Sequence, residues 1–495
     1  MLFTSITFAL FLTILFLLYW FIFNRRLSGQ NLFLLVSSYI FYGWWDWRFA
    51  FLLFFISVSN YFIAILIQKT EQKRHRKLFF ITGLIINIGT LVFFKYFNFF
   101  IEGFIDIASI FGLEASRVTL RIILPIGISF YIFLSISYLI DVYQNKLIAS
   151  TNITDVLLTF SFFPIILAGP IQRPISLLPQ IKSKRVFNAD IAADGLRQIL
   201  WGLFMKIVIA DNCVKYVYDI FLNFTNYSGS TLIVGIFLFT IQIYADFAGY
   251  SNIAIGIGKL LGFNLMKNFA FPYFSRDIKE FWRRWNISLT SWFRDYVFLP
   301  VAYSVSRNIK SDRFFLIKTD VLIYIIGIAV TWILTGLWHG ANYTFIIWGA
   351  IHGFFLVMHH LTVKPKKRWL KRLNIPNNNS ILILFETFVT FLIVMFSLIF
   401  FRAESAGHAL SYISGIFSMS LFSIPEIRPK TLLIFIVLFS IAEWLGRKQE
   451  YAIADFCSKW PKLLRWAMYY SIILARYKQR CRYLNKERIS EKIIG

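Results

Sequence analysis

The strongest constraint on this sequence is the length of its apolar runs, because a membrane-spanning helix needs about 17–25 predominantly apolar residues. Runs of this kind recur along the chain, and 58% of its 495 residues are hydrophobic, whereas a soluble domain has about 45–50%. We therefore predict an all-α polytopic membrane protein. The first run, residues 2–23, lacks a small-residue cleavage site and is too long for a signal-peptide core, so we expect it to be retained.

Eleven spans are expected, with about 10–12 transmembrane helices as the range and re-entrant or interfacial helices besides. They lie near residues 2–23, 31–44, 48–68, 78–99, 120–141, 154–170, 231–250, 318–337, 342–361, 380–401 and 431–446.

The charge of the chain indicates how these spans are oriented. Lys and Arg number 51 against 25 acidic residues, and the basic residues gather in short loops, as the positive-inside rule requires. We prefer this interpretation to nucleic-acid binding. An outside N-terminus would place four basic clusters in the cytoplasm, at residues 25–26, 69–77, 307–318 and 364–372.

Residues 182–185 (KSKR) do not fit this orientation if residues 154–170 cross the membrane completely. Two prolines and a glycine interrupt the apolar run at 168–174, and residues 186–226 alternate charged and apolar groups, which suggests a re-entrant or interfacial path. We treat residues 1–446 as one transmembrane domain and 447–495 as a basic segment that is cytoplasmic or interfacial.

Residues 275–296 (SRDIKEFWRRWNISLTSWFRDY) place apolar side chains at three- and four-residue steps, with Arg283 and Arg284 on the opposite side. This pattern is typical of an amphipathic helix in the headgroup region. Asn286 is the exception, because on such a helix it lies about 40° from Trp282, within the apolar face. A buried amide needs polar partners, so we expect Asn286 to point at a polar group.

Four polar residues occur inside apolar runs, where they are costly and usually functional. Asp246 is either a paired structural carboxylate or a catalytic group, and Lys95 is expected to extend to the membrane interface. His352 lies about 15 Å into its helix and is either a hydrogen-bonded core residue or a participant in chemistry. His339 lies between Gly336 and Gly340 at a break between two apolar runs, where there is room for a ligand, and it is the stronger candidate.

These groups suit acyl transfer to an alcohol. A neutral imidazole can accept the proton of an attacking hydroxyl, and an amide such as that of Asn286 can orient the imidazole or bond to the developing oxyanion. The sequence has no glycine-rich phosphate loop, no G-x-S-x-G motif and no metal-binding spacing of Cys213, Cys457 and Cys481. A transporter or flippase for a glycan or lipid remains the alternative from a different class, and a non-catalytic scaffold is a third.

Seven motifs, in order along residues 30–445, resemble those of the membrane-bound O-acyltransferase family, specifically its bacterial polysaccharide O-acetyltransferase branch. They are FFKYFNFF (93–100), LPIGISFYIFLSISYLIDVY (124–143), LAGPIQRPISLLPQI (167–181), QIYADFAGYSNIAIGIGKLLGF (242–263), FPYFSRDIKEFWRRWNISLTSWFRDYVFLP (271–300), LTGLWHGANYTFIIWGAIHG (334–353) and FFRAESAGHAL (400–410). The resemblance implies the fold of that family's helical bundle.

The resemblance also implies that His339, in the WHG motif beside Trp338, is the essential catalytic residue. It implies a second polar site at Asn286, where many relatives of this branch have histidine, and this favours an orienting or oxyanion role over a second base. The implied donor is acetyl-CoA from the cytoplasm, with no permanently bound cofactor and no metal. Our own hypothesis is that Arg283 and Arg284 attract the phosphates of this donor. His352, Asp246 and Trp338 would be supporting residues. A bacterial inner-membrane location, an acceptor on the outer side and a secreted SGNH-type partner are further implications, whereas the basic last fifty residues depart from the family pattern.

Overall fold

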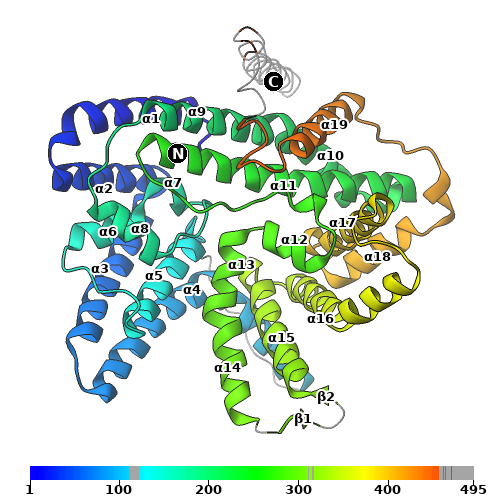
Figure 1. Cartoon of the computed structure of the whole chain (residues 1–495), viewed down its shortest axis with the longest axis horizontal. Coiled ribbons are helices and arrows are strands. Elements are labelled where there is room, and N and C mark those ends of the chain that lie inside the picture. Colours follow the sequence, from blue (N-terminus) through cyan, green and yellow to red (C-terminus); the bar gives the residue numbers. More distant parts are fainter. Residues whose placement is uncertain are drawn as a thin grey trace. The chain divides into compact units, whose positions relative to one another are not determined.

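The computed structural model describes residues 1–111, 122–309, 311–314 and 317–455, together with 461, 463 and 470. The chain forms two compact units. The first consists of residues 1–189, 258–266 and 291–349, and the second of residues 190–257, 267–290 and 350–495. The strands among the described residues are a single short antiparallel pair, β1 (Arg313–Phe314) with β2 (Ile317–Lys318), and all other regular elements are helical (Figure 1). The predicted all-α class is confirmed.

The first unit contains the N-terminal helices and the helix pair that precedes and follows the WHG motif. Its helix α1 continues through a π-helical turn at 18–22 and a 3₁₀ turn at 23–25. The helices are α1 (Ile6–Leu17), α2 (Leu27–Gly43), α3 (Trp47–Lys69), α4 (Lys73–Ile110), α5 (Ile128–Tyr143), α6 (Ile153–Ser161), α7 (Phe163–Ile166), α8 (Pro174–Lys182), α14 (Leu299–Asn308), α15 (Thr319–His339) and the beginning of α16 (Tyr343–Arg372).

The second unit is built around α11 (Gly229–Leu260), most of which lies in this unit. A π-helical stretch at 204–210 joins its first two helices, and 3₁₀ turns occur at 224–226, 272–274 and 419–422. The remaining helices are α9 (Ala189–Leu203), α10 (Asp211–Leu222), α12 (Ile278–Arg284), most of α13 (Ile287–Phe293), the greater part of α16, α17 (Ser380–Arg402), α18 (Ala406–Ile416) and α19 (Lys430–Leu445).

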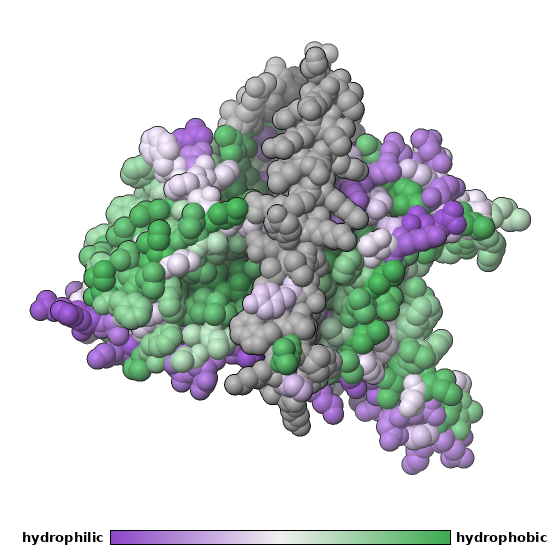
Figure 2. Space-filling model, turned by 90° about the horizontal axis from the view of Figure 1, so that it is seen from above, coloured by the Kyte–Doolittle hydropathy of each residue, from purple (hydrophilic) through white to green (hydrophobic). Residues whose placement is uncertain are grey.

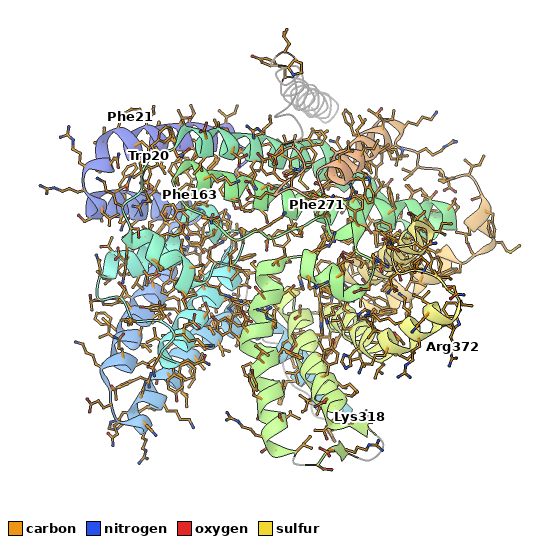
Figure 3. All side chains as sticks on the ribbon, viewed as in Figure 1. Trp20, Phe21, Phe163, Phe271, Lys318 and Arg372 are labelled. Carbon is orange, nitrogen blue, oxygen red and sulfur yellow. The ribbon has the colours of Figure 1, made fainter. Side chains whose placement is uncertain are left out.

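Seven helical stretches among the described residues are long and apolar enough to cross a membrane: Ile6–Arg25, Trp47–Lys69, Lys73–Ile105, Gly229–Leu260, Thr319–His339, Tyr343–Arg372 and Ser380–Arg402. Large apolar side chains such as Phe21, which is 77% exposed (Figure 3), lie on the outside of these helices. Figure 2 shows that hydrophobic residues cover broad areas of the surface while hydrophilic residues gather in smaller clusters. The chain is a multi-pass membrane protein.

Several predicted span boundaries differ from the helices. A continuous span over 154–170 is wrong, because α6 ends at Ser161 and the non-helical backbone of Phe162 (φ −50°, ψ 106°) separates it from the four-residue α7. The span predicted at 120–141 begins only at Ile128, after Gly127 in a left-handed conformation, and residues 120–121 lie outside the described residues. The basic stretch 364–372, predicted as a loop, is the last part of α16. Most of the predicted segment 447–495 also lies outside the described residues, and its separation as a domain stays a prediction.

One residue of the basic cluster at 182–185, Arg185, makes structural contacts, whereas Lys182 and Lys184 are exposed. The Arg185 guanidinium is buried and donates to Gln30 Oε1 at 3.0 and 3.2 Å and to Asn31 Oδ1 at 2.5 Å. The Asn31 amide in turn donates to Asp155 Oδ1 at 3.1 Å. Since this arginine ties the chain after α8 to α2 and α6, it is a structural group rather than a solvated loop charge.

Helices α15 and α16 approach each other closely where they meet. A Cβ atom on Gly336 would lie 2.3 Å from the carbonyl oxygen of Phe345, and one on Gly349 would lie 2.3 Å from that of Trp332. Small residues permit such backbone contact, which is a common way for helices to associate in lipid. This contact fixes the two helices on either side of His339.

We predict that Gly336→Ala lowers the thermal unfolding midpoint of the purified protein, because the added methyl group would overlap the Phe345 carbonyl. Overpacking of this kind costs about 1–3 kcal/mol. Gly89→Ala in α4 is the matched control, since a Cβ there meets nothing within 4 Å. Equal midpoints for the two variants in a detergent melting experiment would contradict the close contact.

Candidate active site

His339 is the last residue of α15, at the point where the backbone leaves the helix. Gly340 is extended, with φ −176° and ψ 161°. The side chain of Asn342 then accepts a hydrogen bond from the Thr344 N–H at 2.9 Å, which caps the start of α16. Three residues therefore separate two apolar helices, and the predicted break at His339 is present.

The imidazole of His339 lies among aromatic rings. Its centroid is 4.8 Å from the ring of Trp338 and 5.0 Å from that of Trp348, both edge-on, and 6.4 Å from Phe345. The two tryptophans are buried and the imidazole is half-buried. This setting excludes most water from one side of the ring while leaving part of it exposed.

Two side chains of α4 bind the carbonyl groups at the end of α15. The Tyr96 hydroxyl donates to the carbonyl of Leu337 at 2.6 Å, and the Lys95 ammonium donates to that of Trp338. The last carbonyls of a helix have no partner within the helix. Lys95, expected to extend to the membrane interface, instead holds the backbone next to His339.

Trp338 also carries a buried hydrogen-bond donor. Its indole N–H is buried and has no hydrogen-bond partner among the residues that the structure describes. A buried polar group of this kind calls for an explanation. Because Trp338 adjoins His339, the N–H is a candidate donor to a substrate oxygen.

The second predicted site lies in the second unit, and its local structure differs from the prediction. Asp277 caps α12 by accepting from the Glu280 N–H at 2.8 Å, while Glu280 accepts from the N–H of Arg276, the residue before the cap, at 2.8 Å. The helix ends at Arg284, Trp285 is extended, and Asn286 is left-handed with φ 42°. The single helix predicted over 275–296 is therefore wrong.

Asn268 stabilises this break from outside the helix. Its carbonyl accepts from the Ile287 N–H at 2.9 Å, and its side-chain oxygen accepts from the Ser288 hydroxyl at 2.7 Å. Asparagine adopts the left-handed conformation more readily than most residues, so Asn286 fits the turn. Its side chain is 3% exposed, and its expected polar partner stays a prediction.

The two arginines beside this break differ in their partners. Arg284 forms an ion pair with Glu280, one helical turn earlier, at 2.5 Å, whereas Arg283 is exposed. Part of the positive charge predicted for donor binding is thus already neutralised.

His352 is buried in the second unit, and protein groups bond to both of its ring nitrogens. The indole of Trp282 donates to Nδ1 at 3.3 Å, and Nε2 lies 3.0 Å from the hydroxyl of Ser397. Because that hydroxyl donates to the Val394 carbonyl at 2.7 Å, it can accept from Nε2–H. The neutral tautomer satisfies all these bonds, which favours the core interpretation of His352.

Asp246 forms an ion pair with a lysine. Lys206 Nζ lies 2.7 Å from Asp246 and 2.9 Å from Asp211. The Asp246 carboxylate is 47% exposed. The structure thus brings together Trp338 and His339 in the first unit, and places Asn286, Arg283, Arg284, His352 and Asp246 in the second.

Comparison with known proteins shows which family the chain belongs to. The model of the membrane-bound O-acyltransferase family matches residues 144–397. The chain is 34% identical to the probable alginate O-acetylase AlgI of Pseudomonas aeruginosa over 435 residues, which is 86% of this chain and 78% of that protein. The chain belongs to the membrane-bound O-acyltransferase family. It is 31% identical to the peptidoglycan O-acetyltransferase of Helicobacter pylori (79% of this chain, 74% of that protein) and 27% identical to the teichoic acid D-alanyltransferase of Bacillus subtilis (57% and 70%).

Sequence reasoning did not find the residues that support the two breaks in this O-acyltransferase. Lys95 and Tyr96 lie in the quoted motif FFKYFNFF, where the only signal was a lysine within an apolar run. Asn268 could not be recognised from the sequence. It lies outside the quoted motif 271–300, and it reaches Ile287 and Ser288 only in the folded chain.

We predict that Asn286→Gly unfolds at the same temperature as the parent protein whereas Asn286→Val unfolds lower, because glycine accepts a positive φ and a β-branched residue resists it. Thermal melting of both purified variants tests this. A glycine variant as unstable as the valine variant would mean that the amide, rather than the backbone conformation, holds the break.

Proposed function

We propose that this protein is a membrane O-acetyltransferase that transfers the acetyl group of cytoplasmic acetyl-CoA across the membrane for O-acetylation of an extracytoplasmic polysaccharide. The observation that carries the proposal is His339, at a helix break in an aromatic setting and within the WHG motif. The acceptor class rests on the relatives, whose names refer to alginate and peptidoglycan O-acetylation. Peptidoglycan, alginate and other exopolysaccharides are all candidate acceptors.

In the proposed reaction His339 acts as a general base. The imidazole accepts the proton of the acceptor hydroxyl while its oxygen attacks the thioester carbon. The resulting tetrahedral oxyanion then collapses with loss of the CoA thiolate, which receives that proton from the imidazolium. A positioned general base typically contributes about 10²–10⁴-fold to the rate.

Two groups are proposed to stabilise the oxyanion or to orient the base. The buried N–H of Trp338 adjoins His339 in sequence and lacks a partner among the described residues. The amide of Asn286 is the other proposed group. Donors that are fixed before reaction stabilise a developing charge more than mobile water does, and the residues that fix these two groups are Lys95 and Asn268.

The other candidate residues are proposed to bind the donor or to support the helices. Arg283 and Arg284 would attract the phosphates of acetyl-CoA, and His352 and Asp246 would support the surrounding helices. The protein would lie in a bacterial inner membrane, need no resident cofactor, and deliver the acetyl group to a secreted SGNH-type acetyltransferase.

We predict that His339→Ala abolishes O-acetylation of the envelope polysaccharide while the protein still accumulates in the membrane. The measurement is the ester-linked acetate of each envelope glycan, together with transfer of radiolabel from acetyl-CoA by the purified protein. His75→Ala, an exposed residue of a basic cluster, is the control. Full acetylation in the His339 variant would exclude the assignment, and a parent protein that neither hydrolyses nor transfers acetyl groups would favour a transporter.

The Asn286→Gly variant separates the amide from the backbone conformation. We expect it to fold and to lose most acetyl transfer, because glycine keeps the left-handed turn but has no side chain. Parent-like turnover in this variant would restrict Asn286 to a structural role.

A further inference from the structure

A polar cavity of about 500 Å³ lies in the first unit, away from the residues assigned so far. The turn after α5 supplies Gln144 and Lys146, and the α14 region supplies Asp295, Ser304, Arg307 and Asn308. Ligand pockets typically measure about 300–1,000 Å³. The cavity is therefore large enough for a sizeable part of a small molecule.

The charges around this cavity favour an anion. Lys146 and Arg307 are exposed, and neither forms an ion pair with a residue that the structure describes. Asp295 is the acidic residue in the lining, and it is already paired with Arg173 at 3.3 Å and with Arg294 at 2.8 Å. Two exposed cations without a direct ion pair remain, although Lys146 interacts electrostatically with the nearby Asp141. They lie beside amide and hydroxyl donors that could also bond to phosphate oxygens.

The segment that lines the cavity also leads to His339. Trp292, three residues before Asp295, stacks on Phe133 at 4.0 Å, and the Phe133 ring lies 5.9 Å from that of Trp338. Trp338 contacts the imidazole of His339. A series of ring contacts therefore connects the segment that lines the cavity with the proposed base, all within the first unit.

The cavity also adjoins the basic clusters that sequence places in the cytoplasm. Arg76, of the cluster 69–77, donates to the Tyr143 carbonyl at 2.8 Å and to Asn145 Oδ1 at 2.5 Å, directly before Lys146. Arg307 begins the cluster 307–318, which ends at Lys318 on the β1–β2 pair (Figure 3). The α3–α4 connection and this strand pair both lie at the lower edge of the first unit in Figure 1.

We propose that this cavity binds the phosphate groups of the acyl donor, with Lys146 and Arg307 as the cationic contacts. The proposal rests on the proposed function, because it takes the donor to be a coenzyme A thioester that enters from the cytoplasm. It places the nucleotide end of the donor at the cavity, in the same unit as His339.

The test compares two variants that each remove two positive charges. Lys146→Ala/Arg307→Ala alters the cavity, whereas Arg313→Ala/Lys318→Ala alters the same basic cluster on the strand pair, outside the cavity lining. We expect the cavity variant to raise the KM for acetyl-CoA about 10- to 100-fold, as the loss of charged hydrogen bonds implies, with kcat largely retained. The control should keep the parent KM, and Lys146→Arg/Arg307→Lys should largely restore it.

Binding of adenosine 3′,5′-bisphosphate, measured by calorimetry on the purified protein in detergent, separates this inference from the proposed function. Weaker binding by the cavity variant, with a parent-like melting temperature, supports the site even if acetyl transfer is absent. An equal loss in both variants would indicate general attraction and overturn the proposal. A rise in KM for acetyl-CoA in Arg283→Ala/Arg284→Ala but not in the cavity variant would also overturn the proposal. If the cavity variant lost only its binding to phosphatidylglycerol, the cavity would be assigned to a lipid headgroup and the proposal would be wrong.

Discussion

The carbonyl groups at the end of α15 are the constraint on which the candidate site depends. A helix that stops within an apolar environment leaves backbone acceptors that water cannot reach, and each costs several kcal/mol in hydrocarbon unless it is bonded. Tyr96 and Lys95 satisfy two of these acceptors, at Leu337 and Trp338. The chain can therefore turn immediately after His339, and the imidazole stays at the break.

The break at Asn286 is stabilised in a similar way. There Asn268, from the segment after α11, bonds to the N–H of Ile287 and the hydroxyl of Ser288. In both cases a polar residue from a different part of the chain replaces the bonds that a continuous helix would have made. Lys95, Tyr96 and Asn268 therefore have a structural role, because each bonds to the irregular backbone at one of the two breaks or beside it.

Sequence periodicity predicted the long helices well because lipid imposes a minimum length and a continuous apolar face. It failed at 275–296 because the apolar side chains keep their three- and four-residue spacing across the break, so nothing in the pattern distinguishes one helix from two. The N–H groups freed there bond to Asn268, whose role depends on tertiary structure. The position of His339 could be predicted because glycines flank it, but the groups that hold it could not.

The excess of basic residues has more than one physical use, and contacts distinguish these uses. Arg185 is buried against α2, Arg76 bonds to the end of α5, and Arg284 is paired with Glu280. Charges committed in this way cannot also bind an incoming anion without losing their present partners, which would offset the gain. An exposed cation without an ion pair has no such cost. Arg284 is therefore a weaker candidate for an anion contact than exposed cations that form no ion pair among the described residues, such as Arg283 in α12, Lys146 after α5 and Arg307 in α14.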